Sequence, residues 1–495
     1  MWRFLSQIVG AILIALPSIV VAEPAQLERR GEAVQLIVDG RPFLIRGGEL
    51  ANSSASHRPF LAPAWERMKA MRLNTVLAPV SWELIEPEEG RFDFSTVDWL
   101  IEDARAHDMR LVLLWFGTWK NSMSTYVPAW VKRDPARFPR TLDDEGQSQE
   151  ILSAHSAETR EADARAFAAM MRHLKIVDED HGTVIMVQVE NEIGFLPLAK
   201  EGTQTGDRAE DERQQARLYA RFANAVAAAG KAEYRLPMFV NGAQRRAGAE
   251  PGEYPSGGPL AHLTREWREE APNIDFIAPD TYFNNFAEIT DAYVASGNPL
   301  FIPEANRASD PRVGANALRA IGRNEAMGFS PFSIDTASVE DAARIASLYG
   351  MLEQLEPLIL DAQADGRIAG FSNQVNFAGE VDLASIEASF EGFTFTATTI
   401  DPWTPRDAQD PSTHGALLIR LGDEDFIVAG QGVTFTVADE KGARQVGLEA
   451  VEEGYFQAGR WTATRRLNGD QTHQGRHVRL PPGDYTIQKM RLYRY

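Results

Sequence analysis

Acidic side chains follow two strand-like segments that lie far apart in the chain. The first segment, Val184-Ile-Met-Val-Gln-Val-Glu-Asn-Glu-Ile-Gly194, begins as a continuous apolar run and turns polar from Gln188 onward. The second segment, Pro299-Leu-Phe-Ile-Pro-Glu304, ends in a single carboxylate. Continuous apolar runs are typical of strands buried on both faces. The sequence therefore predicts two buried strands, each of which ends in a glutamate.

Two carboxyl groups that face each other can hydrolyse a glycosidic bond. One must stay protonated to deliver a proton to the leaving oxygen, while the other must be ionised to attack the anomeric carbon. A separation of about 5–5.5 Å makes the second group a nucleophile and retains the anomeric configuration. The simpler alternative is that the acids at these strand ends reach solvent, because acidic residues are mostly exposed.

The segments between residues 43 and 358 alternate between strand-like and helical patterns. The apolar strand-like segments are 43–46, 74–80, 110–115, 184–194, 237–240, 274–278, 299–303 and 329–334. Helical spacing places apolar stripes at Trp65, Met68 and Leu73; at Val97, Leu100, Ile101 and Ala104; at Phe167, Met170, Met171 and Leu174; at Leu218, Phe222 and Val226; and at Ile345, Leu348, Leu352 and Leu355. Ser95 is expected to cap the second helix, with Asp98 in the capping-box position.

Eight strands alternating with helices predict a (β/α)8 TIM barrel, whose strands all direct their carboxyl ends to one mouth. Glu192 and Glu304 can meet there despite their separation in sequence. A doubly wound open sheet is the alternative fold, although no G-x-G-x-x-G or G-x-x-x-x-G-K motif follows a strand to support a nucleotide-binding version. The long connection from 116 to 157 exceeds ordinary loop lengths, which indicates a functional segment.

The chain divides into three parts. Residues 1–22 are predicted to be a signal peptide, residues 23–370 the barrel preceded by a hairpin that turns at Asp39-Gly40, and residues 371–495 a smaller all-β, sandwich-like domain. Short strand-like segments separated by Gly, Asp and Pro indicate this last domain. It is expected to pack against the barrel, with carbohydrate binding as the alternative role.

The first residues indicate export. A positive start at Arg3, an apolar run from Ile8 to Val21 and small residues up to Ala22 predict cleavage after Ala22 and a periplasmic or secreted protein. An uncleaved membrane anchor is the alternative, but the run is shorter than the ~20 residues that span a bilayer. No later segment is long and apolar enough to cross a membrane.

Composition excludes several classes of function. The net charge of −20 and the absence of a basic stripe disfavour nucleic acid. The chain has no cysteine, and its nine histidines form no H-E-x-x-H or H-x-H pattern, so neither a metal site nor another cofactor is expected. No G-x-S-x-G elbow points to a serine hydrolase. A neutral oligosaccharide or glycoside is the expected substrate.

The polar end of the first segment resembles a known signature. Gln188-Val-Glu-Asn-Glu-Ile-Gly194 is similar to Q-V-E-N-E-Y-G of glycoside hydrolase family 35, the β-galactosidases, and Val80-Ser-Trp-Glu-Leu-Ile-Glu-Pro-Glu-Glu-Gly-Arg-Phe-Asp-Phe94 is similar to that family's W-x-x-x-E-P-x-x-G-x-F-D-F segment. The resemblance spans about residues 35–350. It implies that Glu192 is the general acid/base, that Glu304 is the nucleophile and that Asn191 binds the sugar 2-hydroxyl.

Two departures from the family pattern concern sugar recognition. Where the family shows C-A-E-W after the third strand, this chain has Leu114-Trp-Phe-Gly-Thr-Trp-Lys-Asn121, and Ile193 replaces the signature tyrosine. The chain is therefore expected to be a divergent member with its own C-terminal β domain.

Further residues near strand ends are candidates for substrate binding. The indoles of Trp82, Trp115 and Trp119 can stack against the apolar face of a sugar, or belong to the core. Glu83 can accept hydrogen bonds from hydroxyl groups, or be a solvated acid. Tyr282 follows the sixth strand, where related barrels place a residue that holds the nucleophile; packing is its alternative role.

These observations predict a retaining exo-β-glycosidase, specifically a β-galactosidase that releases terminal galactose from plant-type oligosaccharides. An enzyme that cuts glucan, xylan or mannan chains is one alternative. A carbohydrate-binding protein with an inactive barrel is another, although both carboxylates and the asparagine are present.

Overall fold

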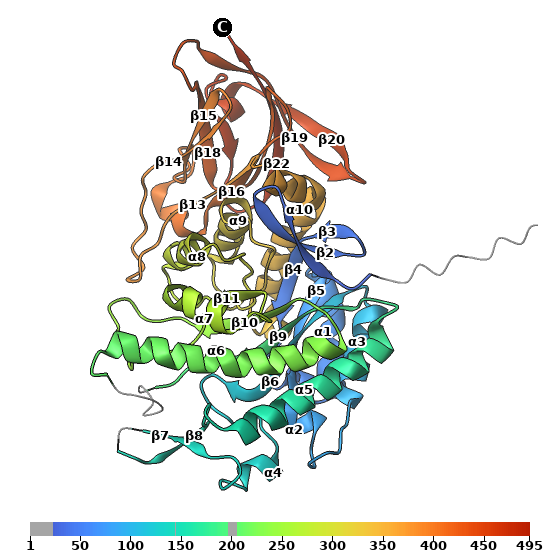
Figure 1. Ribbon diagram of the computed structural model, residues 1–495. Coiled ribbons are helices and arrows are strands. Elements are labelled where there is room, and N and C mark those ends of the chain that lie inside the picture. Colours follow the sequence, from blue (N-terminus) through green and yellow to red (C-terminus); the bar gives the residue numbers. More distant parts are fainter. Residues whose placement is uncertain (1–22, 144, 197–204) are drawn as a thin grey trace, which may run out of the picture.

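The computed structural model describes residues 23–143, 145–196 and 205–495. They form a barrel surrounded by helices, with a β-rich domain stacked on one side of it (Figure 1). The predicted signal peptide, residues 1–22, lies outside the described residues. In the three described ranges, no helix combines the length and the apolar character needed to span a membrane.

Seven parallel strands make most of the barrel wall, in the order β11-β10-β9-β6-β5-β4-β12. They are β4 (Ile45–Glu49), β5 (Thr75–Ser81), β6 (Arg110–Lys120), β9 (Val184–Asn191), β10 (Met238–Ala243), β11 (Phe276–Asp280) and β12 (Gly328–Phe329). Parallel bridges join Asp280 to Glu304 and Ile302 to Phe329, so the segment around 302–304 links β11 to β12. The ring is thereby closed, and the predicted (β/α)8 fold is confirmed.

Four of the observed strands differ clearly from the predicted ones. The first barrel strand begins at Ile45, because residues 41–43 form a strand of the preceding hairpin. The seventh is reduced to bridges, since Pro299 and Pro303 cannot donate to a ladder. The eighth is only the two residues of β12, and the third, β6, continues to Lys120.

The helices lie outside the strands, as Figure 1 shows for α1, α3, α5 and α6. Their bounds are α1 (Arg58–Ala70), α2 (Trp82–Ile85), α3 (Ser95–Ala106), α4 (Ala129–Lys132), α5 (Ala157–Asp178), α6 (Arg208–Glu233), α7 (Thr264–Glu270), α8 (Phe286–Ala295), α9 (Val313–Arg323) and α10 (Val339–Ala364). Their predicted apolar stripes are buried, except Leu218, which is partly buried. Ser95 is the first residue of α3 rather than its cap; its N–H donates to Asp93, and Asp98 contacts His173 instead.

The barrel interior and its floor share one apolar cluster. Ile45, Leu77, Val112 and Phe239 from the strands pack with Leu36 of the N-terminal hairpin. The hairpin consists of β2 (Ala33–Val38) and β3 (Arg41–Phe43) and turns at Asp39-Gly40 as predicted. The strand β1 (Gln26–Arg30) pairs with β2 and completes a three-stranded sheet. A floor plugged by apolar side chains leaves only the carboxyl ends of the strands for a polar site.

The C-terminal domain contains two antiparallel sheets. One has the order β13-β16-β17-β22-β19-β20 and the other β14-β15-β18-β21. The strands are β13 (Ile368–Ser372), β14 (Ile386–Phe390), β15 (Phe393–Thr398), β16 (Gly415–Arg420), β17 (Asp425–Gln431), β18 (Val433–Asp439), β19 (Val446–Gln457), β20 (Arg460–Leu467), β21 (Val478–Leu480) and β22 (Thr486–Arg494). A cluster rich in phenylalanine fills the space between the sheets.

The first of these sheets packs directly on the barrel helices. Leu417, Ile419 and Ile487 belong to the same apolar cluster as the residues of α9 and α10. The contact with α9 is close, because a Cβ on Gly370 would lie 2.5 Å from the Leu318 carbonyl oxygen. Since β13 spans the expected boundary at 370 and pairs with β16, the connection between the two parts is itself a strand of the sheet.

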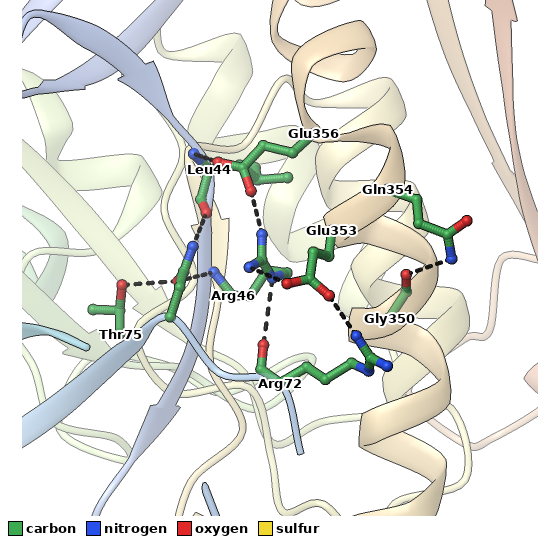
Figure 2. A network of polar contacts seen from close by, with 9 residues as sticks. Leu44, Arg46, Arg72, Thr75, Gly350, Glu353, Gln354 and Glu356 are labelled. Atoms are coloured by element: carbon green, nitrogen blue, oxygen red, sulfur yellow. Dashed lines mark hydrogen bonds and ion pairs between the residues drawn. The ribbon is translucent and has the colours of Figure 1, made fainter. Parts of the chain in front are cut away.

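An ion-pair network ties the first barrel strand to the last helix (Figure 2). The guanidinium of Arg46, which is nearly buried, pairs with Glu356 and lies 3.8 Å from Glu353. Glu353 also pairs with Arg72 at 2.6 Å. Nearby, the hydroxyl of Tyr349 donates to the carbonyl oxygens of Gly47 and Phe329, on β4 and β12. The network and this tyrosine hold α10 across the seam where the barrel closes.

We expect Arg46→Met to lower the free energy of unfolding by about 2–4 kcal/mol, because it leaves two carboxylates without their buried cation. Urea denaturation checks this. Arg91→Met is the control, since Arg91 and Glu88 are both exposed and such pairs contribute about 0–1 kcal/mol. Equal losses in both variants would contradict the role given to the network.

Candidate active site

The polar end of β9 is held in a strained backbone conformation. Glu190 has φ 60° and Glu192 has φ 46°, both in the left-handed region that side chains other than glycine seldom adopt. The amide of Glu192 donates to Asn241 Oδ1 at 3.0 Å, and Glu190 Oε2 accepts from the amide of Trp119 at 2.8 Å. Strain maintained by specific hydrogen bonds is typical of functional sites.

The extension of β6 supplies two side chains to this strand end. Lys120 Nζ donates to Asn191 Oδ1 at 2.9 Å, and Asn121 Nδ2 donates to Glu192 Oε2. Because the oxygen of Asn191 faces lysine, its Nδ2 is left without a partner among the described residues. The side-chain Nδ2 of Asn191 is therefore oriented to donate a hydrogen bond to a ligand.

Glu304 is held by the segment that follows β11. The hydroxyl of Tyr282 donates to Glu304 Oε1, and the amide of Thr281 donates to the carbonyl oxygen of Glu304 at 2.8 Å. Glu304 Oε2 is buried and has no partner in the described part of the chain. One carboxylate oxygen is therefore fixed while the other is available to a reacting atom.

Four buried acids and one cation share the mouth of the barrel. Burial and the charge of Glu192 raise the pKa of Glu304 to about 7. Burial raises the pKa of Glu192, and burial followed by the charge of Glu304 raises the pKa of Glu49 and of Asp280 well above their ordinary values. The ammonium group of Lys120 opposes all four pKa shifts. The site can therefore hold both a protonated and an ionised carboxyl group near neutral pH.

Glu192 and Asp280 also interact directly. A hydrogen bond from Asp280 lowers the pKa of Glu192 against the effect of burial, and Asp280 Oδ2 accepts from Asn241 Nδ2 at 2.6 Å. Since Asn241 Oδ1 accepts from the amide of Glu192, a single asparagine positions both acids. Asp280, whose own pKa is raised well above its ordinary value by burial, thus favours the ionised form of Glu192.

Glu190 belongs to a separate buried pair behind the site. Burial and the charge of Asp163 raise its pKa well above the ordinary value. Asp163 accepts from Trp115 Nε1 at 2.8 Å and from the amide of Thr118 at 2.8 Å. This pair fixes the path of the β6 extension, because Glu190 accepts from the amide of Trp119 and Asp163 accepts from the amide of Thr118.

The predicted stacking platforms lie in the core. Trp82, Trp115 and Trp119 are fully buried, so none of them offers a ring face to a sugar. Trp82 donates to Glu86, Trp115 donates to Asp163, and Trp119 packs edge-on against Phe222 at 4.5 Å. The prediction that these three indoles stack on a sugar is therefore wrong. Their apolar surface stabilises the layer between strands and helices.

The remaining candidates have different surroundings. Glu83 is half-exposed and pairs with Lys132 at 3.4 Å. Tyr282 is 38% exposed and contacts Glu304. Of the predicted binding residues, Asn191 and Tyr282 meet the two glutamates.

Sequence reasoning missed five residues of the site: Glu49, Lys120, Asn121, Asn241 and Asp280. All of them lie at or just beyond the carboxyl end of a barrel strand. This position is the sequence feature that could have identified them as site residues. Among the described residues, no three His, Cys, Asp or Glu side chains are arranged to hold a metal ion.

Comparisons with known proteins bear on the barrel and on the β domain. Residues 57–203 match the model of a family described as beta-galactosidase. Residues 345–479, which begin inside α10, match a family described as a domain of unknown function.

Three curated relatives have similar sequences over part of this chain. The beta-galactosidase of Xanthomonas manihotis is 28% identical over 38% of this chain and 30% of its own length. Beta-galactosidase 13 of Arabidopsis thaliana is 28% identical over 33% of this chain and 20% of its own length. Beta-galactosidase-1-like protein 2 of Homo sapiens is 29% identical over 35% of this chain and 27% of its own length. The predicted likeness to β-galactosidases is confirmed. The chain spans less than a third of the length of each of these relatives.

Solved structures of β-galactosidases are similar to a limited degree. The enzyme from Rahnella sp. R3 has a TM-score of 0.49 and 15% identity, and the alignment covers 67% of this chain and 57% of that one. The enzyme from Marinomonas ef1 has a TM-score of 0.49 and 13% identity, over 64% of this chain and 61% of that one.

We expect Lys120→Met to move the acidic limb of the pH profile of kcat/KM upward by about one pH unit, a tenfold loss of activity below the limb. The reason is that Lys120 lowers the pKa of both Glu192 and Glu304. The profile is measured on a nitrophenyl β-glycoside, with Lys132→Met as the control at the rim. A uniform loss at every pH, with no displaced limb, would refute the electrostatic role.

We expect Glu304→Gln to stabilise the protein at high pH only. Folding raises the pKa of this carboxyl from 4.5 to about 7, so the folded state binds its proton more tightly and wild-type stability falls as the pH rises through that interval. The variant should exceed the wild type by about 3 kcal/mol at pH 8 and match it at pH 4.

Urea denaturation at the two pH values tests this difference. Glu83→Gln, which removes a half-exposed acid from the rim, should show no pH-dependent change. A Glu304→Gln variant that is less stable than the wild type at pH 8 would contradict the raised pKa of Glu304 in the folded protein.

Proposed function

We propose that this protein is a retaining exo-β-glycosidase, a β-galactosidase that releases terminal galactose from plant-type oligosaccharides. The observation that carries the proposal is the meeting of Glu192 and Glu304 at one mouth, where the charge of one raises the pKa of the other. The matching family model and the named relatives support galactose as the sugar. A divergent branch of glycoside hydrolase family 35 is the proposed assignment, based on the signature at 188–194.

In the first step, Glu304 attacks the anomeric carbon through its free Oε2. Tyr282 holds the other oxygen by a hydrogen bond and limits the orientations of the carboxylate. Glu192 donates a proton to the departing oxygen, so the aglycone leaves as an alcohol and a glycosyl-enzyme ester forms. Protonation of Glu192 in the presence of substrate is helped by burial, which already raises its pKa.

In the second step, the same groups act in reverse. Glu192, now ionised, removes a proton from water, and the resulting oxygen attacks the anomeric carbon on the face the aglycone left. The ester bond breaks and Glu304 is released as a carboxylate, whose charge Lys120 stabilises. Two inversions restore the original configuration.

Unpaired polar atoms at the mouth match a sugar with several hydroxyl groups. Asn191 Nδ2 is a donor, while Glu49 Oε1 is buried without a partner among the described residues. Buried polar atoms are costly when unsatisfied, so a ligand that pairs with them binds with a substantial gain. The donor is assigned to the 2-hydroxyl of the terminal sugar.

The buried indoles favour an exo enzyme over a chain-cutting glycanase. A glycanase needs several exposed platforms along an open cleft, whereas Trp82, Trp115 and Trp119 are all in the core. The non-catalytic alternative is disfavoured, because a binding protein has no need for two buried acids with raised pKa values. The protein is further proposed to be exported, by cleavage after Ala22.

A panel of nitrophenyl glycosides tests the substrate. We expect release of nitrophenol from the β-galactoside and not from the β-glucoside, β-xyloside or β-mannoside. Shortening of polysaccharides with no activity on any monoglycoside would favour the glycanase. Binding of glycans without turnover would favour the non-catalytic protein.

Chemical rescue tests the roles of the two acids. Glu304→Gly should lose about 10⁴-fold or more in activity and regain turnover with azide, giving the α-glycosyl azide. Glu192→Gly should give the β-azide on an activated substrate, because the glycosyl-enzyme still forms on Glu304. Exchange of these two products would reverse the assignment.

A further inference from the structure

A hairpin of the C-terminal part reaches the rim of the barrel near Glu304. Between β13 and β14, Val375 and Val381 form an antiparallel bridge, and Asn376 Nδ2 donates to Glu380 at 2.7 Å. Figure 1 shows this segment descending from the β domain beside α8. The hairpin of residues 374–382 is thus an internally bonded structure that projects from one domain toward the other.

Two contacts fix the hairpin to the loop that carries Tyr282. Phe377 packs edge-on against Phe283 with ring centroids 5.3 Å apart, and Asn284 Nδ2 donates to the Phe377 carbonyl oxygen at 3.1 Å. Asn284 Oδ1 accepts from Arg312 at 2.7 Å. The hairpin therefore leans on the residues next to the tyrosine that holds the nucleophile.

A cleft of about 580 Å³ opens where these segments meet. It is lined by Asn284, Asn306, Ser309, Val375 and Ser412, among others. Asn284 lies two residues after Tyr282 and Asn306 lies two residues after Glu304, so the cleft is lined by the loops that carry these two site residues. Its volume is within the ~300–1,000 Å³ of sites that hold small organic ligands.

The chemistry of the lining favours a neutral ligand rich in hydroxyl groups. Asp310 and Asp410 also line the cleft, which disfavours anions. Arg312 is the one basic side chain among the described residues of the lining, and Asp310 and Asn284 already hold it. Pro311, Val375 and Val381 add apolar surface to the lining beside these polar groups, a combination that suits a sugar ring.

We propose that this cleft, formed jointly by barrel loops and the 374–382 hairpin, binds neutral sugar units beyond the terminal residue of an oligosaccharide. The inference rests on the proposed function, since it concerns the aglycone of the same reaction. It gives the β domain a role in substrate selection in addition to packing. Long neutral oligosaccharides should be better substrates than disaccharides with the same terminal linkage.

The test compares chain lengths in the full-length protein. Neutral β-galactosyl disaccharides and tetrasaccharides of several linkages are assayed, together with nitrophenyl β-galactoside, which has no second sugar. For the preferred linkage, the wild type should show at least tenfold higher kcat/KM on the tetrasaccharide than on the disaccharide. Ser309→Trp fills the cleft, and Phe377→Ala removes the ring contact that holds the hairpin against Phe283. Each variant should lower the ratio of kcat/KM on the tetrasaccharide to kcat/KM on nitrophenyl galactoside about tenfold, which is 1.4 kcal/mol.

Tyr495→Ala is the matched control, because Tyr495 is an exposed aromatic at the tip of the same domain, where Figure 1 marks the C-terminus, away from the hairpin. It should leave the ratio unchanged. Equal kcat/KM of the wild type on both chain lengths would overturn the proposal that the cleft binds sugar units. So would variants that keep the wild-type ratio while circular dichroism shows them to be folded. A wild type that releases no nitrophenol from the galactoside would instead overturn the proposed function, and the inference with it.

Discussion

Burial of four carboxyl groups around one ammonium group, with repulsion between some of them, is the constraint on which this structure depends. Glu49, Glu192, Asp280 and Glu304 lie at the carboxyl ends of different barrel strands or just beyond them, and Lys120 is the cation that opposes the rise in pKa of each. Such a cluster costs folding free energy, because each charge is removed from water. A glycosidase benefits from that cost, since it needs one acid protonated and another ionised at the same pH.

The rest of the fold holds this cluster in place. Left-handed backbone at Glu190 and Glu192 is maintained by bonds to Trp119 and Asn241, and similar strain occurs at Asn121 on the β6 extension. Each such residue costs about 1–3 kcal/mol. The closed barrel, with α10 clamped across its seam, supplies the stability that offsets these costs.

The β domain packs on the barrel and reaches the loops beside the site. Its first sheet shares an apolar cluster with the helices α9 and α10, so it is fixed to the barrel. From this base the 374–382 hairpin contacts the loop after β11, next to Tyr282. The domain that stabilises the barrel is thereby also placed to contact substrate.

The sequence predicted the fold and the two central glutamates because buried strands leave a strong pattern and their ends share one mouth. It failed where strand bounds decide which side chain reaches that mouth. With the first strand expected at 43–46, Glu49 fell beyond its end, whereas β4 runs to Glu49 itself. Lys120 was assigned to a loop because Gly117 and Thr118 interrupt the apolar run and hide the continuation of β6.

The tryptophans illustrate the opposite error. Proximity to a strand end suggested a sugar platform, but side-chain direction is set by the pleat of the strand and by available partners. Trp115 turns toward Asp163 on α5, a contact between residues far apart in sequence that no local pattern reveals.

Trapping of the covalent intermediate tests the central claim most directly. A 2-deoxy-2-fluoro-β-galactosyl fluoride should inactivate the protein with one label per chain, and mass spectrometry of the digested protein should find the label on Glu304. Label on Glu192, Glu49 or Asp280, or hydrolysis of β-galactosides with no label formed, would contradict the account.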